Sequence, residues 1–173
     1  MKSCFKFFVL FYCLDFINGS FRCDYKYSSK AQAWFKFAVV PANWFDARLR
    51  CLLEGAVLAS PTTPEILTEM RNIMNRSNPE YEIFTGIHAT VSQGDYYTIE
   101  GTPLSKIPVS WAESQTLVEA GYSKFSSGQP NNVAPGQSCG GIYRSSLLVD
   151  IFCDRPATFI CEKSPGFPFV CRA

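Results

Sequence analysis

Eight cysteines in a chain of 173 residues constrain the fold more than any other feature of this sequence. Two of them, Cys4 and Cys13, lie in an N-terminal segment in which lysines precede an apolar run over residues 7–12 and small residues follow near Gly19. This order is typical of a secretory signal peptide, predicted here over residues 1–19. The apolar run is shorter than the roughly 20 residues of a membrane-spanning helix, and no longer run follows. We therefore expect a secreted, extracellular product without a membrane span.

Export makes disulfide bonds available. Six cysteines remain after removal of the signal peptide, namely Cys23, Cys51, Cys139, Cys153, Cys161 and Cys171. The alternative is a structural zinc site, which requires clustered cysteine or histidine ligands. The sequence contains no Cys-x-x-Cys pair, and His88 is its single histidine. Disulfides are favoured, and the residues by themselves leave the pairing open.

The net charge excludes some partners. The chain carries 16 basic and 15 acidic residues, and the two become equal in number once Lys2, Lys6 and Asp15 leave with the signal peptide. A neutral chain without a lysine or arginine block lacks the electrostatic footprint of a protein that binds nucleic acid or an anionic membrane. The mature length fits one domain.

The first predicted helix begins after Asn43, a residue type favoured at helix N-caps. Trp44, Ala47 and Cys51 follow at the spacing of one buried helix face. We expect this helix to end near Gly55, since glycine is common just after a helix.

A second helix is predicted after residue 61. Thr62 and Glu65 match the capping-box pattern, and Pro64 is tolerated in the first turn. Its apolar residues form one stripe that packing into the core explains better than a ligand groove does: Ile66, Met70, Ile73 and Met74. The sequence Asn75-Arg76-Ser77 that follows is an N-glycosylation sequon, expected on a surface turn.

Short strands are predicted elsewhere, over residues 33–40, 83–88, 96–99, 147–152 and 158–162. Between residues 110 and 137 the chain is rich in Ser, Gly, Asn and Pro and shows little periodicity. A loop of this length in a compact domain usually has a function. Helices followed by strands and a long loop indicate the α+β class.

Three groups of residues resemble the C-type lectin fold over residues 31–163. Residues 44–59 look like the first helix of that family and the strand entry after it. Residues 84–88 look like its Trp-Ile-Gly-Leu core strand, with Phe84 and Thr85 in place of Trp and Ile. Gln129-Pro130-Asn131, followed by three cysteines at the closing spacing of the family, resembles its sugar-binding end. Residues 47–61 and 84–107 are especially similar to the secreted insect lectins called immulectins.

The resemblance implies the fold and the pairing of the cysteines. We expect two helices flanking short antiparallel sheets, stabilised by disulfides Cys51–Cys161 and Cys139–Cys153. Residues 20–30 would form an N-terminal extension, and residues 164–173 a tail tied back by Cys171. Because the family brings its termini together, Cys171 is paired with Cys23; an intermolecular bond is the alternative.

The resemblance also implies a calcium site that holds a sugar. It assigns both carbohydrate and metal binding to Gln129, Asn131, Gln137 and Asp150. Asp150 alone is anionic, and Val149 stands where the family has an asparagine, so we expect weak or lost calcium binding. The Gln129–Pro130 peptide bond is expected to be cis. An auxiliary calcium site is expected to be absent, because Asn132 and Ser138 occupy its acidic positions.

Catalysis is not expected. Residues 136–140 fit the Gly-x-Ser-x-Gly pattern of a nucleophile elbow, but no histidine follows Ser138. His88 lies within an apolar strand and is interpreted as structural. The resemblance implies recognition of microbial surface glycans in innate immunity.

A protein or lipid partner bound without calcium is the alternative function. Compared with immulectins, residues 112–124 look like additional loop, lying between Trp111 and Phe125 and carrying Leu117, Val118 and Tyr122. Exposed apolar anchors of this kind suit a partner surface. The other interpretation is that these residues fold back onto the core.

Overall fold

The computed structural model describes residues 24–92, 94–107, 125–131 and 136–165. The signal peptide, Cys23, Cys171, Trp111, residues 112–124 and Asn132, about which the sequence makes predictions, lie outside these ranges. The described elements are β1 (Lys26–Ser28), β2 (Ala33–Ala42), α2 (Trp44–Leu53), β3 (Val57–Leu58), α3 (Pro64–Ser77), β4 (Ile83–His88), β5 (Tyr97–Thr98), the 3-10 turn η1 (Leu104–Lys106), β6 (Cys139–Ile142), β7 (Leu148–Ile151) and β8 (Ala157–Lys163).

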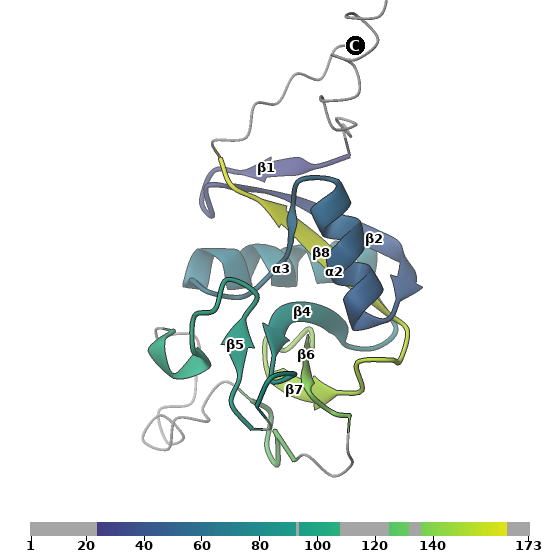
Figure 1. Ribbon diagram of the computed structural model, residues 1–173. Coiled ribbons are helices and arrows are strands. Elements are labelled where there is room, and N and C mark those ends of the chain that lie inside the picture. The colour runs from purple at the N-terminus through teal and green to yellow at the C-terminus, as the bar shows by residue number, and fades with distance from the viewer. Residues whose placement is uncertain (1–23, 93, 108–124, 132–135, 166–173) are drawn as a thin grey trace, which may run out of the picture.

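The strands form one sheet in the order β1-β2-β8-β4-β6-β7, with β3 added to β8 and β5 added to β4 (Figure 1). All pairings are antiparallel except that of β4 with β8, which meet in parallel at Phe84 and Phe159. The predicted α+β class is confirmed, and the sheet is mixed rather than wholly antiparallel. The long pairing of β2 with β8 places the first and last described parts of the chain side by side.

Helix α2 begins where the sequence predicts. The Asn43 side chain accepts a hydrogen bond from the Asp46 backbone N–H at 2.8 Å. Trp44, Ala47 and Cys51 form the buried face, and the Trp44 indole N–H donates to the Thr85 carbonyl oxygen at 2.8 Å. The Trp44 contact fixes the helix against the middle of β4.

Helix α3 begins one residue later than predicted. Its N-cap is Thr63, whose hydroxyl accepts from the Ile66 N–H at 3.2 Å, whereas the Thr62 N–H donates to the Ser60 carbonyl in a preceding turn. Pro64 is the first helical residue. Because proline is favoured at this position, it moves the cap to the residue directly before it.

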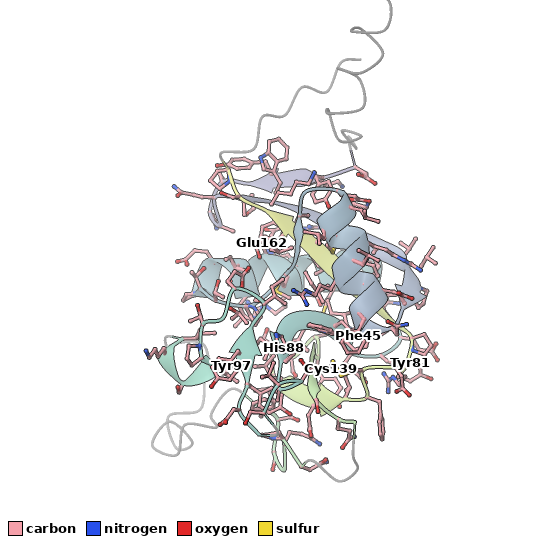
Figure 2. All side chains as sticks on the ribbon, viewed as in Figure 1. Phe45, Tyr81, His88, Tyr97, Cys139 and Glu162 are labelled. Carbon is pink, nitrogen blue, oxygen red and sulfur yellow. A yellow bond between two sulfur atoms is a disulfide. The ribbon has the colours of Figure 1, made fainter. Side chains whose placement is uncertain are left out.

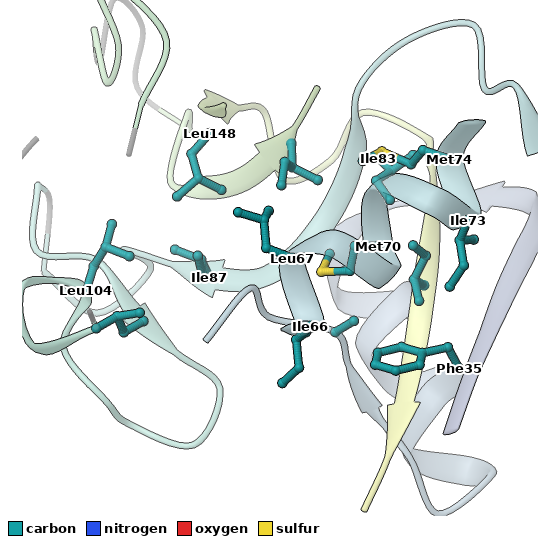
Figure 3. Packing of buried hydrophobic residues seen from close by; sticks show 14 of the residues in the cluster. Phe35, Ile66, Leu67, Met70, Ile73, Met74, Ile83, Ile87, Leu104 and Leu148 are labelled. Atoms are coloured by element: carbon teal, nitrogen blue, oxygen red, sulfur yellow. The ribbon is translucent and has the colours of Figure 1, made fainter. Parts of the chain in front are cut away.

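The predicted apolar stripe of α3 is buried, and Leu67 joins it. Figure 3 shows these side chains packed against Phe35 of β2 and against Ile83 and Ile87 of β4. Asn75 is exposed in the last turn of the helix rather than on a separate turn. The helix continues past the sequon because Asn78, in the left-handed conformation, provides its C-cap.

The prediction for residues 83–88 matches β4, whereas β1 and β6 were not predicted. Strand β6 reads Cys-Gly-Gly-Ile, a composition with few strand formers. A Cβ atom at Gly140 would lie 2.9 Å from the Ile87 carbonyl oxygen. Glycine is therefore required by close contact between β6 and β4, which local composition does not indicate.

Both disulfides implied by the resemblance are present. Cys51–Cys161 joins α2 to β8 with a Cα–Cα distance of 5.3 Å, and Cys139–Cys153 joins β6 to the chain after β7 with a Cα–Cα distance of 5.2 Å. In the described ranges, no helix is long and apolar enough to span a membrane.

Candidate carbohydrate and calcium site

The segment with the Gln-Pro-Asn triplet is held against the start of β7. Phe125 is buried and pairs with Leu148, and the Ser126 N–H donates to the Leu148 carbonyl at 2.7 Å. The Phe125 ring packs on the Tyr96 ring with centroids 5.2 Å apart. This anchor brings residues 126–131 next to the strand that carries Asp150.

Asp150 is the anionic residue of this region. It lies on β7 opposite Gly140 of β6, and only 2% of its surface is exposed. Its Oδ1 accepts a hydrogen bond from the Asn131 backbone N–H at 3.1 Å. This hydrogen bond places the Asp150 carboxylate next to the triplet. The structure therefore brings together two of the residues assigned to the site.

The other two assigned residues are glutamines with buried oxygens. The Oε1 atoms of Gln129 and Gln137 are shielded from solvent and have no hydrogen-bond partner. Gln137 lies two residues before Cys139, the first residue of β6. Strand β6 pairs with β7, which carries Asp150. The Gln129–Pro130 bond is cis, as the resemblance implied. Buried polar oxygens without donors are uncommon in folded proteins.

Tyr96 is a residue of this region that the sequence did not single out. Its hydroxyl donates to the Gln137 carbonyl oxygen at 3.5 Å. Burial raises the pKa of Tyr96, and the negative charge of Asp150 raises it further. Tyr96 thus links Gln137, Asp150 and the anchor at Phe125. The sequence predicted a strand over residues 96–99, and Tyr96 directly precedes β5, but no local signal indicates this role.

The donor set fits a hard cation that binds oxygen. Gln129 and Gln137 offer unpartnered amide oxygens, and Asp150 offers a carboxylate. Calcium accepts such ligands, and its affinity depends on how many of them are charged. Val149 is buried and contributes no side-chain oxygen. Across the part of the chain that the structure describes, no three His, Cys, Asp or Glu side chains are grouped to hold a metal. Calcium at this site would therefore need amide or backbone oxygens in addition to the Asp150 carboxylate.

The contacts of His88 and the bonding of Cys139 bear on the catalytic pattern over residues 136–140. The His88 Nδ1 lies 2.9 Å from the Thr90 hydroxyl, and its ring packs 5.0 Å from that of Trp44. Burial lowers the pKa of His88, and the positive charge of Arg48 lowers it further. Cys139, next to Ser138, is disulfide-bonded. These contacts support the structural interpretation of His88.

Residues 40–163 match the family model of the lectin C-type domain. The chain belongs to this family, whose domains are generally non-enzymatic, and the predicted resemblance is confirmed. The mouse scavenger receptor C-type lectin carbohydrate-recognition domain has a TM-score of 0.64 at 18% identity, covering 84% of this chain and 98% of that one. Human lithostathine also has a TM-score of 0.64, at 17% identity, covering 83% of this chain and 90% of that one.

Two curated relatives are longer proteins. The hemolymph lipopolysaccharide-binding protein of Periplaneta americana is 28% identical over 142 residues, which cover 78% of this chain and 50% of the relative. The human C-type lectin domain family 4 member K is 22% identical over 132 residues, which cover 75% of this chain and 35% of the relative. The chain thus spans half or less of the curated relatives it matches.

Proposed function

We propose that this protein is a secreted lectin that recognises microbial surface glycans in innate immunity through a weak calcium site. The observation that carries the proposal is the pair of buried, unpartnered oxygens of Gln129 and Gln137, close in the fold to Asp150. The name of the insect relative, a lipopolysaccharide-binding protein of hemolymph, supports the class of target.

The site residues supply two kinds of ligand. Gln129, Asn131 and Gln137 present amide oxygens, and Asp150 supplies the negative charge and orients the Asn131 backbone. Calcium, when bound, offers open coordination positions to sugar hydroxyls. Tyr96 holds the Gln137 backbone in place. With one carboxylate, we expect a Kd toward the millimolar end of the calcium range.

The test is thermal unfolding with and without calcium. A ligand bound only by the folded state stabilises it, and at a Kd of about 1 mM, about 10 mM calcium contributes about 1.4 kcal/mol. For a domain of this size we expect the Tm to rise by about 4 °C. Retention on mannan or galactose resin should require millimolar calcium and reverse with EDTA.

Asp150→Asn should abolish both the Tm shift and the retention. The fold should persist, because the asparagine oxygen still accepts from the Asn131 N–H. Asp154→Asn is the matched control, since Asp154 is exposed four residues away and has no place in the site. Superimposed unfolding curves up to several millimolar calcium, together with no EDTA elution, would contradict the proposal.

That result would favour the second candidate, a calcium-independent module that binds a protein or lipid partner. The presence of a single carboxylate among the four site residues is the observation in its favour. Residues 112–124, outside the described ranges, are the proposed partner loop. Deleting them should then leave the Tm nearly unchanged, whereas a large loss of stability would indicate that they belong to the core.

Further parts of the proposal concern processing. We propose cleavage of residues 1–19, an N-terminal extension over residues 20–30, a lectin domain over residues 31–163, and a tail over residues 164–173 held by Cys23–Cys171. Asp24 forms an ion pair with Lys36, and both charges act on Lys163. The two ends of the described chain are thus near each other, which supports this pairing. Glycosylation of the exposed Asn75 and the absence of catalysis complete the proposal.

A further inference from the structure

The outer face of α2 is apolar. Four residues that point away from the sheet are between 50% and 74% exposed: Phe45, Leu49, Leu52 and Leu53. They fall within one sector of the helix at the i, i+4 and i+7/i+8 spacing, opposite the buried Trp44, Ala47 and Cys51. We call these four residues the α2 face. Figure 1 shows α2 on the outside of the sheet, and Figure 2 labels Phe45 near the N-terminal end of the helix.

Two further valines extend this surface. Val39 and Val40 of β2 are 71% and 62% exposed, at the point where the register of β2 with β8 shifts. The Arg50 guanidinium, which borders the α2 face, donates to the Val40 carbonyl oxygen at 3.3 Å. The exposed valines therefore lie beside the helix.

The area suits a small interface between proteins. With roughly 100 Å² exposed per residue, the six side chains present on the order of 600 Å², the upper end for the largest apolar patch of a monomer. Two such surfaces together bury about 1,200 Å², which is the lower limit of a specific interface. A second copy of this chain supplies the same area.

The charges at one edge of the face fit a second copy in the antiparallel orientation. Asp46 and Arg50 are exposed on the same edge of α2. In an antiparallel pair of helices with a twofold axis at Leu49, Phe45 of each helix meets Leu53 of the other. Measured along the helix axis, Asp46 of one copy then lies about 3 Å, or about two residues, from Arg50 of the other. Two equivalent ion pairs result, one for each half of the interface.

The helix is rigid before association. Asn43 caps its N-terminus, the Trp44 indole is bonded to β4, and Cys51 is bonded to β8. A preformed face loses little conformational entropy on docking. We propose that the α2 face is a homodimer interface, in which two copies of the chain pair through antiparallel α2 helices about a twofold axis at Leu49. The proposal is independent of the function proposed above.

Sedimentation velocity of the purified protein tests this proposal. We expect a monomer–dimer equilibrium with a Kd on the order of 10 µM, as suits an interface of minimal area. Leu49→Glu places two like charges at the axis and should leave a folded monomer at about 200 µM. Val91→Glu is the matched control, because Val91 is 89% exposed in the loop between β4 and β5, and it should dimerise as the unmodified chain does.

Charge exchange distinguishes a second copy from any other occupant. Asp46→Arg and Arg50→Asp should each weaken self-association roughly tenfold or more, because each variant opposes like charges. An equimolar mixture of the two variants should form heterodimers with the affinity of the original, since opposite charges then face each other at both positions. The melting temperature of each variant verifies its folding.

Several results would overturn the proposal. One is a chain that remains monomeric at about 200 µM, and another is a mixture of the charge variants that does not associate. If the full chain is monomeric and dimerises only after deletion of residues 166–173, the tail of the same chain covers the α2 face. A monomer that binds anionic phosphatidylglycerol vesicles and loses this binding with Leu49→Glu would assign the face to a lipid surface.

Discussion

Glu162 lies on β8 with its carboxyl group close to the Ser60 backbone and to Glu100. Burial above all, and the charge of Glu100 in addition, raise the pKa of Glu162 to about 7 against the opposing effect of a hydrogen bond from the Ser60 backbone. The folded state therefore binds this proton more tightly than the unfolded state, in which the pKa is near 4.5. The stability that protonation provides is complete below the unfolded value and is lost as the pH rises through the folded value.

Glu162→Gln should remove this pH dependence. The amide keeps the shape of the protonated acid, so we expect similar stability near pH 4 and a gain of about 1–3 kcal/mol at pH 8. Urea unfolding at both pH values measures the difference. Asp154→Asn is the control for the loss of one carboxyl group at an exposed position. A parallel pH profile for Glu162→Gln and the unmodified chain would contradict the assignment.

Between elements, β4 lies close against the chain that follows β3. The Gly86 N–H donates to the Ala59 carbonyl at 2.9 Å. A Cβ atom at Gly86 would lie 2.4 Å from both the Leu58 carbonyl oxygen and the Ser60 hydroxyl oxygen. The Leu58 oxygen belongs to the backbone and cannot rotate away, so these two segments would have to separate.

Gly86→Ala should therefore destabilise the fold by about 2–4 kcal/mol. Gly94→Ala is the matched control, because Gly94 has a φ of +87° but no atom within 4 Å of its Cβ position. It should cost about 1 kcal/mol, through backbone strain alone. Chemical unfolding of the two variants measures the difference. A loss for Gly86→Ala no larger than that for Gly94→Ala would contradict the steric cost assigned to this close approach.

For the whole molecule, the Cys51–Cys161 bond spans 110 residues, whereas Cys139–Cys153 spans 14. In the chain-entropy account, the longer loop contributes about 4–5 kcal/mol and the shorter about 3 kcal/mol. Cys51→Ala/Cys161→Ala should accordingly lower the free energy of unfolding more than Cys139→Ala/Cys153→Ala.

The shorter disulfide should have a second effect. It holds the chain that carries Gln137 and Asp150, so its removal should also abolish the calcium-dependent Tm shift. Differential scanning calorimetry with and without calcium measures both effects. A calcium response that persists without Cys139–Cys153 would mean that the site does not depend on this bond.

The sequence by itself determined the helices and strands that depend on interactions between residues close together in the chain. Asn43 and the spacing of Trp44, Ala47 and Cys51 predicted α2, the apolar stripe predicted α3, and residues 83–88 predicted β4. Capping hydrogen bonds and side-chain periodicity act within a few residues, so the sequence records them directly. The disulfide pairing and the site residues came from the resemblance to a family, because both depend on cysteines and ligands that are distant in the chain.

The tertiary structure decided what depends on contacts between distant segments. Strand β6 exists because Gly140 fits closely against Ile87, although its sequence contains two glycines. Tyr96 joins the site through Gln137, 41 residues away in sequence. The α2 face is exposed because the opposite side of the helix packs against β4 and β8. The physical reason is the same in each case: burial and close packing are properties of segments brought together by the fold, and local sequence does not specify which segments will meet.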